Sequence, residues 1–394
     1  MAHERDALIT GIGLVSCLGA TLDAHWAALN DPAGFSPVLD TDTFPPFAVH
    51  PMAALDLDKQ IPKRGDQRQM EAWQRIGTFA AGLALDSAGV KGDTDLLSHM
   101  DMIVAAGGGE RDYAVDAGIL SGYPKAADPG VFLNERLVGD LRPTLFLAQL
   151  SNLLAGNISI VHGVTGSSRT FMGEEAAGAD AVRIACARIA AGQGDIVLVG
   201  GSYNAQRPDI LLHYEMGRLL RRAPFDGIWS RQQSGGGMIL GSVGCFLVIE
   251  SRAHASRRAA QAFAHVAGVR TDRCRREPAQ ATANARAQID ALRFDPTGSA
   301  VISGATGVTA PTQEEQAMLA ALGLPVRATA TALGHSLEPS FLASLGLAAL
   351  SVRHGRLFGP LEQAEAPMAG PLNQVLVTSW GHWRGEAAAV LAAA

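Results

Sequence analysis

The stretch Thr170–Asp180, TFMGEEAAGAD, decides how the rest of this sequence is interpreted. It follows a strand-like run and precedes a segment that is apolar nearly all round, so it predicts a strand, a turn and a buried helix. Many enzymes that transfer acyl groups present a serine or cysteine nucleophile at such a junction. Here the turn carries two glutamates, Glu174 and Glu175. The question is what a carboxylate does where a nucleophile is expected.

The composition is that of a large globular protein. The 394 residues are 47% hydrophobic and include 44 glycines, which suits one large α/β unit or two fused domains. A formal net charge of −6 provides no bulk attraction to nucleic acid or to an anionic membrane. No apolar run approaches the roughly 20 residues that span a bilayer, and the N-terminus lacks the pattern of a secretory signal. We therefore expect a cytoplasmic protein without membrane insertion.

The cysteines and the other ligand-type residues indicate no metal and no cofactor. The four cysteines show neither CxxC spacing nor a paired framework, and no His, Asp or Glu spacing indicates a metal site. The glycines of TGIGLVS (10–16) begin a dinucleotide fingerprint, but Ser16 occupies the position of its third glycine. That signal is too weak to predict a bound dinucleotide.

Short β-rich segments alternate with helical ones along the chain, which indicates α/β layers. Long helices are predicted at 68–90 and 144–163. No low-complexity linker separates the two halves of the sequence, so we expect them to share one core. Strands are predicted in four early apolar runs: ALITGIGLVS (7–16), MDMIVAAGGG (100–109), DIVLVGGS (195–202) and GCFLVIES (244–251).

In this order and spacing, the segments resemble a β-ketoacyl-acyl-carrier-protein synthase of the synthase II type over nearly the whole chain. LITGIGLVSCLGATLDAHWAAL (8–29) is similar to the opening strand, turn and helix of that family. APFD (223–226) and GGGMILGSVGCFLVIESRAHASRRAA (235–260) resemble its central signature. The resemblance implies the thiolase fold, in which two similar halves, here 1–250 and 251–394, stack as five αβαβα layers and usually dimerise.

The condensing chemistry of this family uses a cysteine and two histidines. Glu175 stands at the position that matches the cysteine, and TGVTAP (306–311) places Thr306 at the first histidine. ATALGHS (330–336) keeps the second histidine, His335, but has Ala330 where the family has a lysine. In GHWRGE (381–386), His382 and its neighbours Trp383 and Arg384 replace the family's aromatic and small residues. The candidate site residues are therefore Glu175, Thr306, His335 and His382.

A carboxylate at this turn has two interpretations. Glu174 and Glu175 can simply complement the helix dipole, which contributes about 0.3–1 kcal/mol at exposed positions. The resemblance instead implies that Glu175 is buried, where a carboxylate is costly unless it is paired. His335 and Arg384 are the candidate partners, and a glutamate is in any case a poor acyl acceptor.

None of the cysteines is expected to replace the missing nucleophile. Cys186 lies roughly 16 Å further along the same predicted helix, so it is expected to pack in the core. Cys17 and Cys245 lie in apolar runs and have the same interpretation. Cys274 lies among arginines, which leaves open a reactive thiol of low pKa or an ordinary surface loop.

The resemblance implies three possible functions, of which the first is a partner subunit without condensing activity of its own. Such a protein pairs with a catalytically intact synthase, as chain-length factors do, and we expect acyl carrier protein as a further partner. The second is a malonyl-thioester decarboxylase or altered acyltransferase that uses Glu175 and His335, and the third is a homodimeric lipid-binding scaffold. The overall match resembles the synthase-like proteins of bacterial very-long-chain fatty acid and lipid A synthesis. A basic cluster at Lys63, Arg64 and Arg68 is the candidate docking site for the carrier protein.

Overall fold

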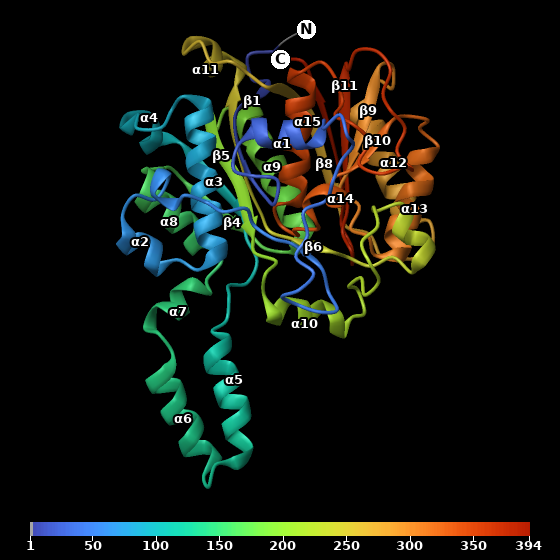
Figure 1. The fold of residues 1–394 in the computed structure, drawn as a ribbon. Helices are drawn as coiled ribbons and strands as arrows, with labels where there is room; N and C mark the ends of the chain where they lie inside the picture. Colours follow the sequence, from blue (N-terminus) through green and yellow to red (C-terminus); the bar gives the residue numbers. More distant parts are fainter. Residues whose placement is uncertain (1–2) are drawn as a thin grey trace.

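The computed structural model describes residues 3–394, and ten of its strands form one continuous sheet (Figure 1). The spatial order of these strands is β10-β9-β11-β12-β8-β1-β7-β5-β3-β4. The first half of the chain supplies β1 (Ala7–Val15), β3 (Asp101–Ala105), β4 (Ser168–Phe171), β5 (Ile196–Tyr203) and β7 (Val243–Ser251). The second half supplies β8 (Ala264–Asp272), β9 (Ser299–Ser303), β10 (Val326–Ala328), β11 (Gln374–Trp380) and β12 (Glu386–Ala392).

The two halves of the sheet have the same topology. In each, the first strand pairs antiparallel with the last strand, and the three strands between them in sequence are parallel to one another. The halves join where β1 pairs antiparallel with β8, Ala7 facing Val266 and Ile9 facing Ala264. The fold is thus a structural duplication that the sequence does not display as a repeat.

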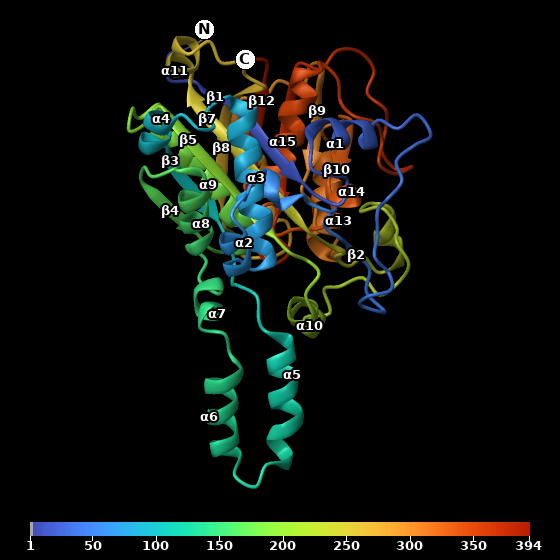
Figure 2. The same cartoon turned by 60° about the vertical axis from the view of Figure 1, so that its left-hand side comes forward.

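Helices complete five layers, as the sequence predicts. Between the two halves of the sheet lie α9 (Glu174–Ala190) and α15 (Ser340–Arg353), and one large hydrophobic core contains both (Figures 1 and 2). The outer face of the first half is covered by α3 (Ala72–Ala88) and α8 (Leu153–His162). The outer face of the second half is covered by α12 (Gln280–Leu292) and α13 (Thr309–Ala320). The αβαβα architecture is confirmed.

The glycines of the opening strand serve close packing. A Cβ atom on Gly13 would lie 2.0 Å from the backbone oxygen of Ala80, and one on Gly11 would lie 2.4 Å from that of Ala84. Both oxygens belong to α3, so the helix can lie against β1 only because these positions lack side chains. This contact gives the GxG pattern a structural reason that involves no nucleotide.

Both long helices predicted from the sequence are shorter than expected. The segment 68–90 divides into α2 (Arg64–Gln69) and α3, because Met70 and Glu71 have extended backbone and Glu71 forms a capping box with Gln74. The segment 144–163 divides into α7 (Pro143–Ala148) and α8, which are separated by a turn. Exposed Phe146 and Leu150 gave this segment the apolar character that suggested one buried helix.

A helical hairpin projects from the body of the molecule. It consists of α5 (Tyr113–Gly122) and α6 (Pro129–Asp140), and Figures 1 and 2 show it extending away from the sheet. Neither helix has a buried residue. Apolar side chains lie exposed on both, including Leu120 at 75% and Val138 at 79% of their accessible area.

The remaining elements are short. They are β2 (Val49–His50) and β6 (Leu240–Gly241), which pair parallel, together with α1 (Leu22–Leu29), α4 (Thr94–His99), α10 (Pro208–Met216), α11 (Arg252–Arg257), α14 (Ala330–Leu333) and three 3₁₀ turns at Leu57–Lys59, Tyr123–Lys125 and Ser230–Ser234. Across residues 3–394, none of the helices combines the length and the apolar character that crossing a membrane requires.

Candidate active site

Glu175 lies in the first turn of α9, at the end of the strand–turn–helix junction predicted from the sequence. The chain leaves β4, passes Gly173 with a φ of 128° and enters the helix at Glu174 with a φ of 56°. A positive φ on a non-glycine residue is strained and is often found at functional sites. The turn brings Glu175 into the interior, where it is 2% exposed.

One oxygen of Glu175 accepts three hydrogen bonds. Nε2 of His335 lies 2.7 Å and Nδ1 of His382 lies 2.8 Å from Oε1 of Glu175. The backbone N–H of His382 donates to the same oxygen at 3.1 Å. We call Glu175, His335 and His382 the carboxylate cluster. It joins the first turn of α9 to two segments that lie 160 and 207 positions further along the sequence.

The two histidines are held by backbone bonds and by packing. His335 lies between α14 and α15, and its backbone N–H donates to the carbonyl of Ile239 at 2.8 Å. His382 follows β11, and the ring of Tyr214 packs edge-on against it with centroids 5.3 Å apart. Nε2 of His382 lies 3.6 Å from Oε1 of Glu174. Both glutamates of the turn therefore face the same imidazole.

Hydrogen bonds and opposite charges in the carboxylate cluster outweigh the desolvation that burial causes. Burial alone would raise the pKa of Glu175, but hydrogen bonds from His335 and His382 and the charges of both rings outweigh it and lower that pKa. Burial alone would lower the pKa of His382, but the hydrogen bond and charge of Glu175, with the charge of Glu174, raise it. Both shifts favour a carboxylate beside an imidazolium.

The structure does not bring every candidate residue to the cluster. Thr306 is buried, but its Oγ1 accepts a hydrogen bond from the backbone of Val308. Arg384 is exposed, and among residues 3–394 no hydrogen bond or ion pair joins it to Glu175. Of the two partners expected for Glu175, only His335 is observed. Tyr214, which packs on His382, and Glu338 nearby were not identified from the sequence.

No cysteine is activated near the turn. Burial raises the pKa of Cys17 and of Cys186 to about 12 and that of Cys245 further. Burial raises the pKa of Cys274 to about 11, and a hydrogen bond with Glu386 and the negative charge of Glu386 contribute to this increase. Because a nucleophilic cysteine must be a thiolate, the interpretation of Cys274 as a thiol of low pKa is wrong.

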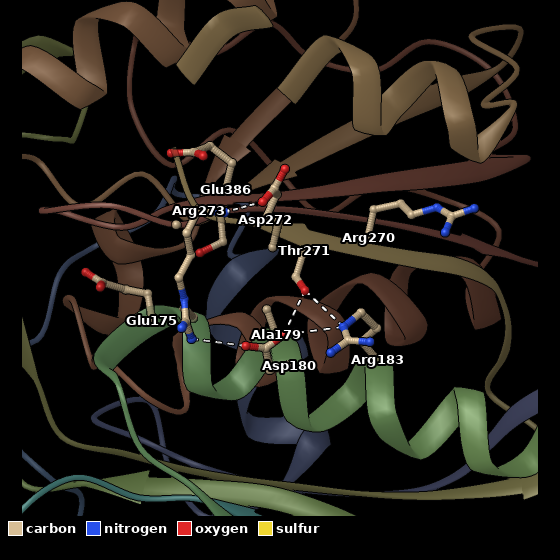
Figure 3. Close-up of a pocket in the computed structure, with 13 residues that line it drawn as sticks. Glu175, Ala179, Asp180, Arg183, Arg270, Thr271, Asp272, Arg273 and Glu386 are labelled. Carbon is tan, nitrogen blue, oxygen red and sulfur yellow. Dashed lines mark hydrogen bonds and ion pairs between the residues drawn. The ribbon is translucent and has the colours of Figure 1, made fainter. Parts of the chain in front are cut away.

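Three cavities border the carboxylate cluster or the adjoining Glu174. The first, about 440 Å³, is lined by Glu175 and by charged residues of α9 and β8. Figure 3 shows it, with the Glu175 carboxylate turned away from the bonded group of Asp180, Thr271 and Arg273. The second, about 720 Å³, has His382 on its wall. It is also lined by Arg273, Arg275, Arg276 and Arg384 and by the apolar side chains of Leu219, Val308, Pro311 and Trp383.

The third cavity, about 240 Å³, has a mixed lining that includes charged groups. Glu174, Tyr203, Arg207 and Glu338 contribute to its wall. Burial raises the pKa of Glu338 to about 7, with further contributions from the charges of Glu175 and Glu174. Such a lining does not suit a long alkyl chain, because charged and hydrogen-bonding groups lose solvent there without gaining partners.

The candidate docking residues for a carrier protein, Lys63, Arg64 and Arg68, are exposed around α2.

The carboxylate cluster also has the capacity to bind a metal ion. Glu175, His335 and His382 each offer a ligand atom, and these atoms all lie within 4.8 Å of one another. The sequence predicted no metal site here because no short spacing connects the three residues.

Comparison with known proteins places these features in a family. Residues 4–255 match the family model of the β-ketoacyl synthase N-terminal domain. The chain is 24% identical over 275 residues to 3-oxoacyl-acyl-carrier-protein synthase 2 of Vibrio cholerae, covering 67% of this chain and 62% of that protein. The chain thus spans about three fifths of the length of this relative.

Two further matches extend over more of the chain. It is 26% identical over 388 residues to the oxytetracycline polyketide putative β-ketoacyl synthase 1 of Streptomyces rimosus, covering 89% of this chain and 85% of that protein. Among solved structures, the ishigamide ketosynthase/chain length factor superposes with a TM-score of 0.79 at 20% identity and covers 99% of both chains. This structural likeness shows a shared fold.

The cluster predicts a characteristic pH dependence of stability for the metal-free protein. The raised pKa of His382 stabilises the folded protein at pH values below the pKa of this histidine in the unfolded chain, about 6.5. This stabilisation is lost as the pH rises through the pKa of His382 in the folded protein. The lowered pKa of Glu175 adds stability above its unfolded value, about 4.3, and this is lost on acidification. The substitution Glu175→Gln should therefore lower the free energy of unfolding most between about pH 5 and 6.5, by about 3–5 kcal/mol.

Urea unfolding of both proteins across this pH range, in a chelating buffer, measures the difference. The two stabilities should approach each other at high pH. A constant difference at every pH would show that Glu175 acts by its shape and not by its charge.

Proposed function

Since the chain belongs to the β-ketoacyl synthase family, we propose that it serves acyl-chain synthesis as a non-condensing partner of an active synthase. The observation that carries this proposal is Glu175, a carboxylate held by three hydrogen bonds at the position that matches the family's nucleophile. Such a group cannot accept an acyl chain from a thioester and retain it as a thiol does. The elevated pKa values of the cysteines support the same conclusion.

The edge strand β4 and nearby exposed apolar side chains are consistent with binding to a partner of similar fold. β4 is the last strand of its half-sheet, and its residues are exposed or half-buried. An edge strand without a neighbour readily pairs with a second chain. Exposed apolar side chains near it in sequence include Ile160 of α8 and Met172 after β4, and the α5–α6 hairpin carries Leu120 and Val138. We infer that these exposed apolar side chains take part in a protein interface, where apolar surface is commonly covered.

We further propose that acyl carrier protein is the second partner. The name of the Vibrio relative includes such a carrier. In this chain, the four arginines at the 720 Å³ cavity and the exposed Lys63, Arg64 and Arg68 can steer an acidic carrier towards the molecule. The resemblance to very-long-chain proteins makes a very-long-chain fatty acid the first product to test, and a polyketide the second.

Co-expression with a cysteine-containing relative tests the partnership. We expect a heterodimer by mass photometry and a change in the chain length of the partner's products. Leu120→Glu with Val138→Glu on the hairpin should weaken the assembly by at least tenfold, since each buries a charge in an apolar interface. Val38→Glu, at an exposed valine before β2, is the matched control and should leave the assembly unchanged.

A strict homodimer that leaves a partner's products unaltered would contradict the proposal and favour a lipid-binding scaffold. Release of carbon dioxide from malonyl carrier protein by the chain alone would favour the decarboxylase instead.

The nucleophile position can be tested on the chain alone. After incubation with an acyl carrier thioester, intact mass measurement should show no adduct on the wild-type protein. Glu175→Cys gains a thiol at a helix N-terminus, so iodoacetamide should alkylate it. It should still form no β-ketoacyl product, because Thr306 and Ala330 provide neither imidazole nor ammonium to stabilise the transition state.

The triple variant Glu175→Cys, Thr306→His, Ala330→Lys is the comparison in which a trace of product is expected. Efficient condensation by Glu175→Cys alone would mean that the rest of the site is competent, and the partner-subunit proposal would then lose its main support.

A further inference from the structure

The carboxylate cluster has the residues of a transition-metal site. Two imidazoles and one carboxylate are the ligands that bind Zn²⁺, Co²⁺ and Fe²⁺, whereas Mg²⁺ and Ca²⁺ prefer oxygen ligands alone. Three protein ligands leave one position open, as in catalytic zinc sites. Each ligand comes from a different segment of a rigid frame: the N-terminus of α9, the α14–α15 loop and the turn after β11.

The observed distances lie close to those a metal requires. Zinc bonds to nitrogen and oxygen are about 2.0–2.2 Å, so two ligand atoms at a tetrahedral angle stand about 3.3 Å apart. The oxygen–nitrogen distances in the cluster are 2.7 and 2.8 Å. Each oxygen–nitrogen contact would have to lengthen by about half an ångström to admit a cation, and all three ligand atoms lie within 4.8 Å of one another.

The surroundings of His382 suit metal binding. Nδ1 of His335, by contrast, is buried without a hydrogen-bond partner within the described residues, so this ring lacks the outer acceptor that usually orients a metal-bound imidazole. Behind His382, Oε1 of Glu174 lies 3.6 Å from Nε2. A carboxylate behind a metal-bound imidazole orients the ring and raises its basicity. The strained turn at Glu174 places this carboxylate where such a partner is needed.

A cation can also reach the cluster. His382 is on the wall of the 720 Å³ cavity, and Glu175 is on the wall of the 440 Å³ cavity. Glu338 is 5% exposed and lines the adjacent 240 Å³ cavity. Burial and the charges of Glu175 and Glu174 raise the pKa of Glu338, so an added positive charge near the cluster would relieve repulsion between these carboxyl groups.

We propose that Glu175, His335 and His382 form a binding site for one transition-metal dication of the Zn²⁺ class, with Glu174 as the positioning residue behind His382. In the metal-free chain, the proton on His382 supplies the positive charge that the cation supplies when bound. The site extends the proposed function but does not depend on it, because binding concerns the single chain without carrier or partner.

Titration of the untagged, chelator-treated protein with Co²⁺ tests the site. We expect one equivalent to give visible absorption bands of a low-coordinate Co²⁺ centre, and Zn²⁺ to displace them while Mg²⁺ does not. Glu175→Gln and His382→Gln should each lose the bands. Glu174→Gln should bind about 10- to 100-fold more weakly, the usual effect of losing such a carboxylate.

His213→Gln is the matched control, since this imidazole lines the neighbouring 240 Å³ cavity but lies outside the cluster. It should bind as the wild type does. Circular dichroism establishes the fold of each variant, and His382→Gln serves if Glu175→Gln does not fold. Absence of a saturable 1:1 Co²⁺ signal, or equal affinity in His382→Gln and the wild type, would overturn the proposal.

Discussion

A buried carboxylate needs a positive charge close by, and this requirement organises the centre of the molecule. Glu175 begins the helix that lies between the two halves of the sheet, and its Oε1 binds two imidazoles and a backbone N–H from the second half. Removing either charge would leave the other desolvated and unpaired. The cluster therefore connects the two halves through hydrogen bonds to a buried carboxylate.

The cavities beside the cluster differ in their linings. The cavity that leads to His382 keeps a basic and partly apolar wall, which suits a carrier and its acyl arm. The cavity beyond Glu174 contains Glu338 and Arg207 and does not suit an alkyl chain. These linings are consistent with the proposed subunit, which receives a carrier and works beside an active synthase. The exposed hairpin and the free edge of β4 provide surface for that contact.

The sequence was sufficient for the fold, because continuous apolar runs such as those of β5 and β7 are buried on both faces and the order of the segments matched a family. It was also sufficient to place Glu175 beside His335. It could not show that His382 completes the cluster, since hydrogen bonding between residues 207 positions apart leaves no local pattern. Glu338 and Tyr214 were missed for the same reason. The segment 144–163 was misjudged because Phe146 and Leu150 are apolar yet exposed, and a partner surface has the same composition as a core.

The most direct test of this account is the coupling free energy between Glu175 and His382. A double-mutant cycle with Glu175→Gln, His382→Gln and the double variant, measured by urea unfolding near pH 6 in chelating buffer, isolates their interaction. The account predicts a favourable coupling of about 1–3 kcal/mol, the range for residues in one buried network. Additivity within about 0.3–0.5 kcal/mol would contradict it, because Glu175 would then be accommodated without the imidazolium and the carboxylate cluster would not hold the site closed.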